Sequence, residues 1–401
     1  MATKPVVQPS PAQRHTPRAA HTLSVQRRSL MAAIGASAAA MGLPLWAQPS
    51  AATKGDILIG RSTALSGGMA PFLQPIHEGQ DAAIDDANAK GGVGGRKIRL
   101  VTLDDGFDPR RTLENAKQLA EKDGVVALFG VSGTSQVIGL LPYLSQAKLP
   151  LISVYTGSPA VRAQQHPYLF TTRASYADEL VKIVRNLVAV QTSRIAVAYE
   201  NNDFGKLLLP LVEKTIVAEG GTLAGSHALA PTGQDAADAA KALAALKPQA
   251  VLLVAAGPPV VTYVRANRAH LGVPVYALSL AAGSAVLKAL GEDARGLAVA
   301  RTGPSPSRPT IALTRDFQAS MKRYDKPVDY DRYTGYMDGR VLVEGLRAAG
   351  PGVTRASLVT AMQGLGNLDL GGYAYQFSAQ NHHGSNFVDI VVVGPGGVYR
   401  Q

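Results

Sequence analysis

One short loop combines the residue types that nucleophilic catalysis or anion binding would need. It reads Gly130-Val131-Ser132-Gly133-Thr134, follows an apolar run and precedes a helical stretch beginning near Ser135. A serine at such a strand-to-helix turn could be a hydrolase nucleophile, and His382 and His383 come late in the chain, as that triad order requires. The same hydroxyls and backbone N–H groups, at a helix N-terminus beside the carboxyl ends of strands, would instead hold an anionic ligand.

Binding is the favoured interpretation of this loop. The strained turn of a hydrolase carries glycine where this chain has Thr134, and no other hydrolase signature supplies a positioned base. A secreted serine hydrolase that uses Ser132 is the alternative. No metal site is expected, because Asp104, Asp105 and Asp203 lack the spacing of a metal cluster and adjacent histidines do not share a face. No cofactor is expected either, since the glycine-rich 91–95 precedes a strand instead of linking a strand to a helix.

The segments that position this loop indicate an α/β fold. Short continuous apolar runs, typical of parallel strands covered on both faces, alternate with amphipathic helical stretches. Leu180, Ile183 and Leu187 lie on one helical stripe, and Asp108-Pro109 is typical of a helix N-terminus. These βα units exceed what one doubly wound domain uses, so two lobes are expected. The runs that predict strands are 57–59, 125–129, 151–152, 195–199, 251–255, 297–300, 373–377 and 387–393.

Composition and charge exclude several classes of function. The 401 residues are 46% hydrophobic and include no cysteine, which removes disulfides, thiolate metal sites and a cysteine nucleophile. The net charge of +11 depends strongly on residues 1–52, which hold five basic residues and no acid. The remainder has 35 basic and 29 acidic residues, a net +6, without a basic cluster. Nucleic acid is therefore not an expected partner.

Residues 1–52 have the layout of an export signal that is removed from the mature protein. A polar, basic stretch precedes an apolar run rich in alanine and glycine, and small residues offer cleavage points near Ala47 and Ala52. Arg27-Arg28, followed by Ser29, resembles a twin-arginine signal, with an ordinary secretory signal as the alternative. Either reading predicts a soluble periplasmic product.

From Asp56 to its C-terminus the chain resembles periplasmic solute-binding proteins of the leucine/isoleucine/valine-binding family, which serve ABC importers. The resemblance depends on an ordered set of segments, none of which is diagnostic alone. They are Ile59-Gly60, Leu65-Ser66-Gly67, Asn88 to Arg96, Asp104-Asp105, Asp108-Pro109, Leu149 to Ser153, Ile195 to Tyr199, Phe204-Gly205 and Asp369 to Gly372.

The resemblance implies two doubly wound parallel-sheet lobes, joined by three chain crossings, that close on a small ligand. Lobe 1 would comprise 53–172 and 304–365, and lobe 2 would comprise 173–303 and 366–401. The implied partners are a small-molecule ligand and the membrane permease of an ABC importer, with the protein a monomer and not an enzyme. A ligand sensor that docks to a membrane receptor is an alternative role on the same fold.

Site residues carried over from the resemblance come from both lobes. Ser132 and Thr134 would hold a ligand carboxylate, Tyr155 and Thr156 would form the adjoining wall, and Phe204 would close over the ligand from lobe 2. Further ligand contacts are expected from Phe72 in lobe 1 and from Tyr333 near a crossing.

One departure from the family pattern bears on the ligand. Members that bind amino acids place an acid in the second lobe against the ligand's ammonium, whereas here 278–282 reads Leu-Ser-Leu-Ala-Ala. A buried ammonium without a partner is costly. The sequence therefore favours a small organic or aromatic acid over a standard amino acid. An apolar amino acid remains possible if Glu200 or Asp203 supplies the missing charge.

Overall fold

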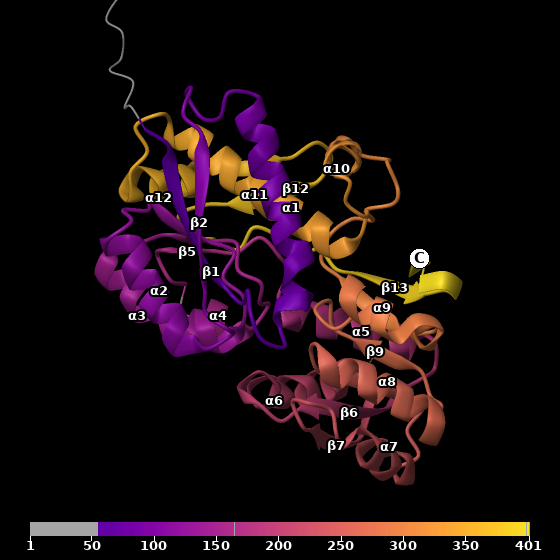
Figure 1. Ribbon diagram of the computed structural model, residues 1–401. Coiled ribbons are helices and arrows are strands. Elements are labelled where there is room, and N and C mark those ends of the chain that lie inside the picture. Colours follow the sequence, from indigo (N-terminus) through magenta and orange to yellow (C-terminus); the bar gives the residue numbers. More distant parts are fainter. Residues whose placement is uncertain (1–54, 164, 398, 401) are drawn as a thin grey trace, which may run out of the picture. The chain divides into compact units, whose positions relative to one another are not determined.

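Two β-sheets organise the part of the chain that the structure describes, which is residues 55–163, 165–397 and 399–400 of a computed structural model (Figure 1). The expected export signal, 1–52, lies outside these residues. The first sheet has the order β2-β1-β3-β4-β5 and is entirely parallel. Its strands are β1 (Ile57–Thr63), β2 (Ile98–Asp104), β3 (Ala127–Phe129), β4 (Leu151–Ile152) and β5 (Leu169–Phe170).

The second sheet has the order β14-β13-β10-β9-β8-β6-β7, with β13 and β14 antiparallel to their neighbours. A separate hairpin pairs β11 (Gly366–Asp369) with β12 (Ala374–Phe377). The strands of the second sheet are β6 (Arg194–Glu200), β7 (Thr222–Leu229), β8 (Ala250–Val254), β9 (Val275–Ala277), β10 (Ala298–Arg301), β13 (Asp389–Val393) and β14 (Tyr399–Arg400).

Helices cover both faces of each sheet, which explains why the strands are continuous apolar runs. On the first sheet, one face packs against α1, α10, α11 and α12, and the other against α2, α3 and α4. On the second, α7, α8 and α9 cover one face, and α5 and α6 the other. The helices are α1 (Ala70–Ala89), α2 (Pro109–Glu121), α3 (Thr134–Ala147), α4 (Pro159–Arg162), α5 (Tyr176–Ala189), α6 (Asp203–Ala218), α7 (Ala236–Ala245), α8 (Pro258–His270), α9 (Ser284–Leu290), α10 (Ala312–Arg323), α11 (Tyr330–Ala349) and α12 (Arg355–Gly364).

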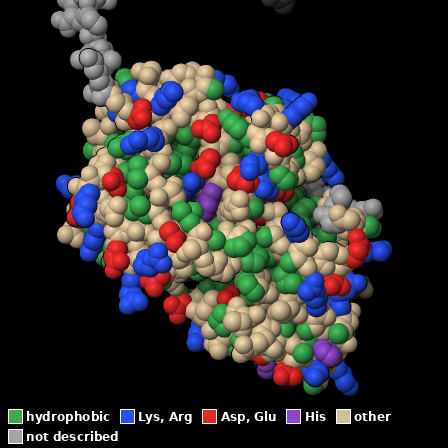
Figure 2. All heavy atoms as spheres, viewed as in Figure 1, with side chains coloured by type: hydrophobic (Ala, Val, Ile, Leu, Met, Phe, Trp, Pro, Cys, Tyr) green, Lys and Arg blue, Asp and Glu red, His purple; other side chains and the backbone are tan. Residues whose placement is uncertain are grey.

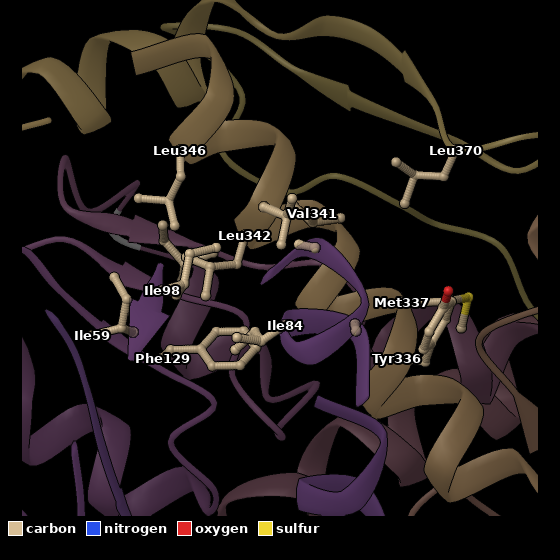
Figure 3. Close-up of a cluster of buried hydrophobic side chains, with 14 of the residues drawn as sticks. Ile59, Ile84, Ile98, Phe129, Tyr336, Met337, Val341, Leu342, Leu346 and Leu370 are labelled. Carbon is tan, nitrogen blue, oxygen red and sulfur yellow. The ribbon is translucent and has the colours of Figure 1, made fainter. Parts of the chain in front are cut away.

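The core of the first lobe joins segments far apart in sequence. Figure 3 shows Ile59, Phe129 and Leu342 among its packed side chains, from β1, β3 and α11. The backbones of α1 and α11 are in direct contact at Gly335. A Cβ on this residue would collide with the carbonyl group of Ile76. Glycine at this position allows the closest approach of the two helices.

The chain passes between the two sheets three times: between β5 and α5, after β10, and between β12 and β13. The first and third passages are bonded to each other, since the Thr171 N–H donates to the His382 carbonyl at 2.9 Å and the Gly384 N–H donates to the Thr171 carbonyl at 2.8 Å. The expected division placed 366–401 wholly in lobe 2. In the structure, Tyr375 and Phe377 of the hairpin are buried in the core of the first lobe, while β13 and β14 extend the second sheet.

Two surface properties follow from the described residues. None of their helices combines the length and apolar character needed to cross a membrane. On the face viewed in Figure 2, basic and acidic side chains are interspersed, so no extended field of one sign covers it.

Candidate functional site

A cavity of about 470 Å³ lies where the two lobes face each other. In both sheets the strand order reverses, at β1/β3 in the first and at β6/β8 in the second. Parallel sheets open a crevice at such a reversal, beyond the carboxyl ends of the strands. The loops that follow β3, β6 and β8 all contribute lining residues, represented by Ser132, Asn201 and Ala256. The cavity therefore lies where the strand order of the two sheets predicts a ligand crevice.

The first-lobe wall contains the start of helix α3. Gly133 is its N-cap, with φ of +99°, and no side chain caps the helix, so its first backbone N–H groups are available to an acceptor. The loop is fixed by Tyr155, whose N–H donates to the Val131 carbonyl at 2.9 Å. Ser132 and Thr134 are both buried and line the cavity. Hydroxyls, N–H groups and a helix N-terminus together suit a carboxylate.

The second-lobe wall contains one buried acid. Glu200 is 7% exposed, and its carboxylate accepts the Asn202 amide at 2.7 Å and the Ala256 N–H at 3.2 Å. Burial raises the pKa of this carboxyl to about 7, and the Ala256 N–H opposes the shift. Glu200 can therefore present either a proton or a negative charge to a ligand near neutral pH.

Apolar and aromatic side chains supply most of the remaining lining. They come from the start of α1, the loop before α2, the loop after β4, and the second lobe. A ligand with an apolar body would bury that body here. These residues are Met69, Leu73, Phe107, Tyr155, Tyr176, Phe204 and Leu280.

Of the residues predicted for the site, four line the cavity: Ser132, Thr134, Tyr155 and Phe204. Thr156 is buried directly behind them, with its hydroxyl oxygen 2.9 Å from that of Thr134. It can hold Thr134 in place but is not among the lining residues.

Phe72 and Tyr333 lie elsewhere. Phe72, on α1, packs against the hydrophobic cluster of the second lobe and lies beside Gly257, so it contributes to contact between the lobes. Tyr333 is fully buried, stacks on Phe317 with ring centroids 4.6 Å apart, and has its hydroxyl 2.6 Å from that of Thr314. The sequence assigned the Tyr333 ring to the ligand cavity, but in the structure this ring is buried between α10 and α11.

The histidines of the hydrolase alternative are engaged away from Ser132. His382 stacks on Phe170, with ring centroids 4.1 Å apart. His383 has its Nδ1 3.0 Å from the Thr171 hydroxyl, at the passage between lobes. The lining of the cavity includes no histidine. No imidazole among the described residues is thus positioned to activate Ser132.

Some residues of this region were not predicted. Tyr176 follows the N-cap Ser175 of α5 and lines the cavity, and Gln136 and Phe107 line it from the first lobe. Arg173 lies just behind, with its guanidinium 4.6 Å from the centre of the Tyr155 ring. The only sequence signal for Arg173 is a charged residue three positions after a short apolar strand.

Comparison with known proteins gives a consistent result. Residues 56–397 match a family model described as periplasmic binding protein. Among solved structures, a possible leucine/isoleucine/valine-binding protein from Rhodopirellula baltica SH 1 is 27% identical with a TM-score of 0.80, over 88% of this chain and 98% of that one. A substrate-binding periplasmic protein from Ralstonia solanacearum is 30% identical with a TM-score of 0.79, over 86% and 99%.

A curated relative, an amino acid binding protein of Pseudomonas aeruginosa, is 25% identical over 38% of this chain and 41% of its own length. The matched stretch thus spans less than half of that relative. The structural matches confirm the predicted α/β fold with two lobes, and they cover nearly the full length of the matched chains.

Proposed function

Because the chain belongs to the periplasmic binding protein family, we propose that it captures a small carboxylate-bearing solute between its lobes and delivers it to an ABC importer. The family is non-catalytic, which confirms the expectation that this protein is not an enzyme. The proposed ligand is an organic or aromatic acid, or an apolar amino acid. The proposed location is the periplasm, with residues 1–52 as the export signal.

The observation that carries this proposal is the composition of the cavity. An uncapped helix N-terminus with two buried hydroxyls faces it from the first lobe, and Phe204 with Leu280 faces it from the second. A carboxylate with an apolar body satisfies both walls at once. Only a closed arrangement lets both lobes touch one ligand, so binding shifts the population toward closure.

Glu200 is the residue that supports an amino acid as ligand. It is the one acid of the lining that is buried, whereas Asp203 is exposed. When ionised, Glu200 can pair with an α-ammonium group from the second lobe, in place of the acid missing from 278–282. An organic acid without an ammonium needs no such partner and would favour the protonated form of Glu200.

A thermal-shift screen of the purified protein tests the proposal. The panel contains branched-chain and aromatic amino acids, aliphatic carboxylates and aromatic acids, with sugars and cations as negative controls. A ligand at 100 times its Kd adds about 2.7 kcal/mol of stability, which raises Tm by several degrees. The expected result is a shift with at least one carboxylate. Shifts with sugars or cations alone would contradict the proposed ligand class.

Delivery to an importer needs a separate experiment. Deletion of the gene should abolish uptake of the identified solute by intact cells, and expression of the chain should restore it. Intact uptake combined with a lost transcriptional response to the solute would instead favour the sensor alternative.

A further inference from the structure

The turn before α2 holds an aromatic residue in a backbone conformation that favours glycine. The Asp108 N–H donates to the Asp105 carbonyl at 3.0 Å, which closes a four-residue turn. The two central residues, Gly106 and Phe107, have φ of +57° and +64°. Turns with positive φ at both central positions are dominated by glycine, asparagine and aspartate, because a larger side chain strains the backbone there. The backbone gives no reason for phenylalanine at this position, so the reason must lie in its side chain.

Phe107 differs from residues such as Lys148, Gln191 and Lys247, which also have positive φ. Those three lie one or two residues beyond the last residue of a helix. A left-handed residue commonly ends a helix, where it lets backbone N–H groups reach the last carbonyls. Phe107 lies two residues before α2 begins, so helix termination does not account for its conformation.

Hydrogen bonds hold this strained turn in place. The carboxylate of Asp105, which is 1% exposed, accepts the Phe107 N–H at 2.9 Å. The same carboxylate accepts the hydroxyls of Ser62 and Thr112, at 2.9 and 3.0 Å. On the other side, the amide of Gln136, in the first turn of α3, donates to the Phe107 carbonyl at 2.7 Å. The position of the ring is therefore set by the fold before any ligand binds.

The ring of Phe107 lies beside the start of α3, where the proposed function places the ligand carboxylate. Phe107 is half-buried and lines the ligand cavity, so a ligand can reach it. A Cβ on Gly133, the N-cap of α3, would come within 3.0 Å of the Phe107 Cζ. A ligand that binds its carboxylate at this helix start therefore places the group next to that carboxylate against the Phe107 ring.

Three further aromatic rings line the same cavity. Tyr155 packs in the same hydrophobic cluster as Phe107. Tyr176 and Phe204 line the cavity from the second lobe and are packed edge to face, with ring centroids 5.7 Å apart. Aromatic rings attract one another beyond the burial of apolar area, because the electron-rich face of one meets the electropositive edge of the other. Both walls thus offer contacts that an aromatic ligand uses more fully than a saturated one.

We propose that Phe107 is a specificity-determining residue and that the natural ligand is an aromatic carboxylate, either an acid or an amino acid. This inference rests on the proposed function. The carboxylate binds at the Ser132–Thr134 loop, and the ligand ring packs on Phe107 in the first lobe and meets Phe204 from the second. The strained turn is retained because it presents a ring, already in position, next to the carboxylate site.

The first experiment uses the unaltered protein and matched ligand pairs. Calorimetric titration compares benzoate, phenylacetate, 3-phenylpropionate and phenylalanine with their cyclohexyl analogues, which keep the carboxylate and the carbon skeleton and lose the aromatic ring. At least one aromatic member should bind about threefold or more tightly than its analogue. A smaller ratio for every pair overturns the inference and, as long as any carboxylate binds, leaves the proposed function standing. Failure of every acid and amino acid to bind removes both.

The second experiment uses Phe107→Leu, with Phe387→Leu as a control. Phe387 is 40% exposed and is not among the residues that line the ligand cavity, so its loss removes a ring without touching the site. Phe107→Leu should lower affinity for the preferred aromatic ligand about threefold or more, and leave affinity for its cyclohexyl analogue within about twofold. Equal loss for both ligands would assign Phe107 a structural role, and an unchanged preference would remove it from recognition; either result contradicts the inference. Should this variant fail to fold, the comparison of ligand pairs decides alone.

Discussion

Ser135 and Asp203 face each other across the cavity, with the Ser135 hydroxyl donating to the Asp203 carboxylate at 3.3 Å. Ser135 is in the first turn of α3 and Asp203 begins α6, so this bond joins the two lobes at the ligand site. A bond between the two lobes can form only while they lie this close together. Asp203 is exposed and Ser135 is half-buried, which makes the bond a weak stabiliser of closure.

Asp203→Asn should therefore weaken ligand affinity only modestly. An exposed bond of this kind contributes about 0.2–1 kcal/mol, which is at most about fivefold in Kd. Titration calorimetry measures this, with Asp238→Asn on α7 as a control for loss of one exposed acid. A loss of two orders of magnitude would show that Asp203 contacts the ligand directly.

Glu200→Gln should change how stability depends on pH. The folded-state pKa of Glu200 is about 7 against an ordinary value near 4.5. The folded protein therefore binds more protons between these values, and its stability falls as pH rises through that window. Removing the acid should make the variant more stable than wild type above pH 7 by about 1–3 kcal/mol, with a smaller difference near pH 4.5.

Urea denaturation at pH 5 and pH 8 measures that difference. Asp338, whose pKa burial also raises to about 7, titrates in both proteins and cancels in the comparison. Parallel pH profiles for wild type and variant would contradict the assignment. If the ligand is an amino acid, the same variant should also lose affinity for it.

Tyr333→Phe should destabilise the fold and leave the ligand site intact. The hydroxyl bonded to Thr314 is buried in the core of the first lobe, so its loss costs about 1 kcal/mol. Because the ring does not line the ligand cavity, Kd should stay within about twofold of wild type. Chemical denaturation and calorimetry on one sample separate the two effects, and unchanged stability with weakened binding would restore the ligand role.

Gly335→Ala should be strongly destabilising. Its Cβ would collide with the Ile76 carbonyl group, forcing α1 and α11 apart at a cost of about 1–3 kcal/mol. Gly364→Ala is the matched control, because a Cβ there meets nothing within 4 Å at the end of α12. A thermal melt that ranks the two variants equally would contradict this account of the helix pair.

The sequence predicted most of the central strands, but it missed the short central strand β9 and the strands at the sheet edges. Strands β6 and β8 are buried on both faces and appear as continuous apolar runs. Strand β2 forms one edge of the first sheet, and β7 forms one edge of the second. Both are only half-buried, and polar residues interrupt their apolar pattern. The N-cap at Asp108 was predicted correctly, since the signal is local and its carboxylate accepts the Arg110 N–H at 2.8 Å.

The residues of the candidate site also fall into those with a local sequence signal and those that only tertiary contacts place. Ser132 and Thr134 follow from a local strand–loop–helix pattern, and the structure places them in the cavity. Arg173 depends on Ser279, which is 106 residues away, and on Tyr155 in another loop. Tyr333 was assigned to the ligand by position near a crossing, but packing across two helices decides where its ring lies. Tertiary contacts of this kind leave no periodic signal in a single sequence.

The most direct test of the binding account is a calorimetric titration of wild type and Ser132→Ala with the carboxylate that gives the largest thermal shift. Ser226→Ala, an exposed serine on β7 bonded to Glu213, serves as the control. The account predicts that Ser132→Ala weakens binding about tenfold or more, as expected for loss of a hydrogen bond to a buried carboxylate, while Ser226→Ala has no effect. Equal affinities for all three proteins would contradict carboxylate recognition at the start of α3.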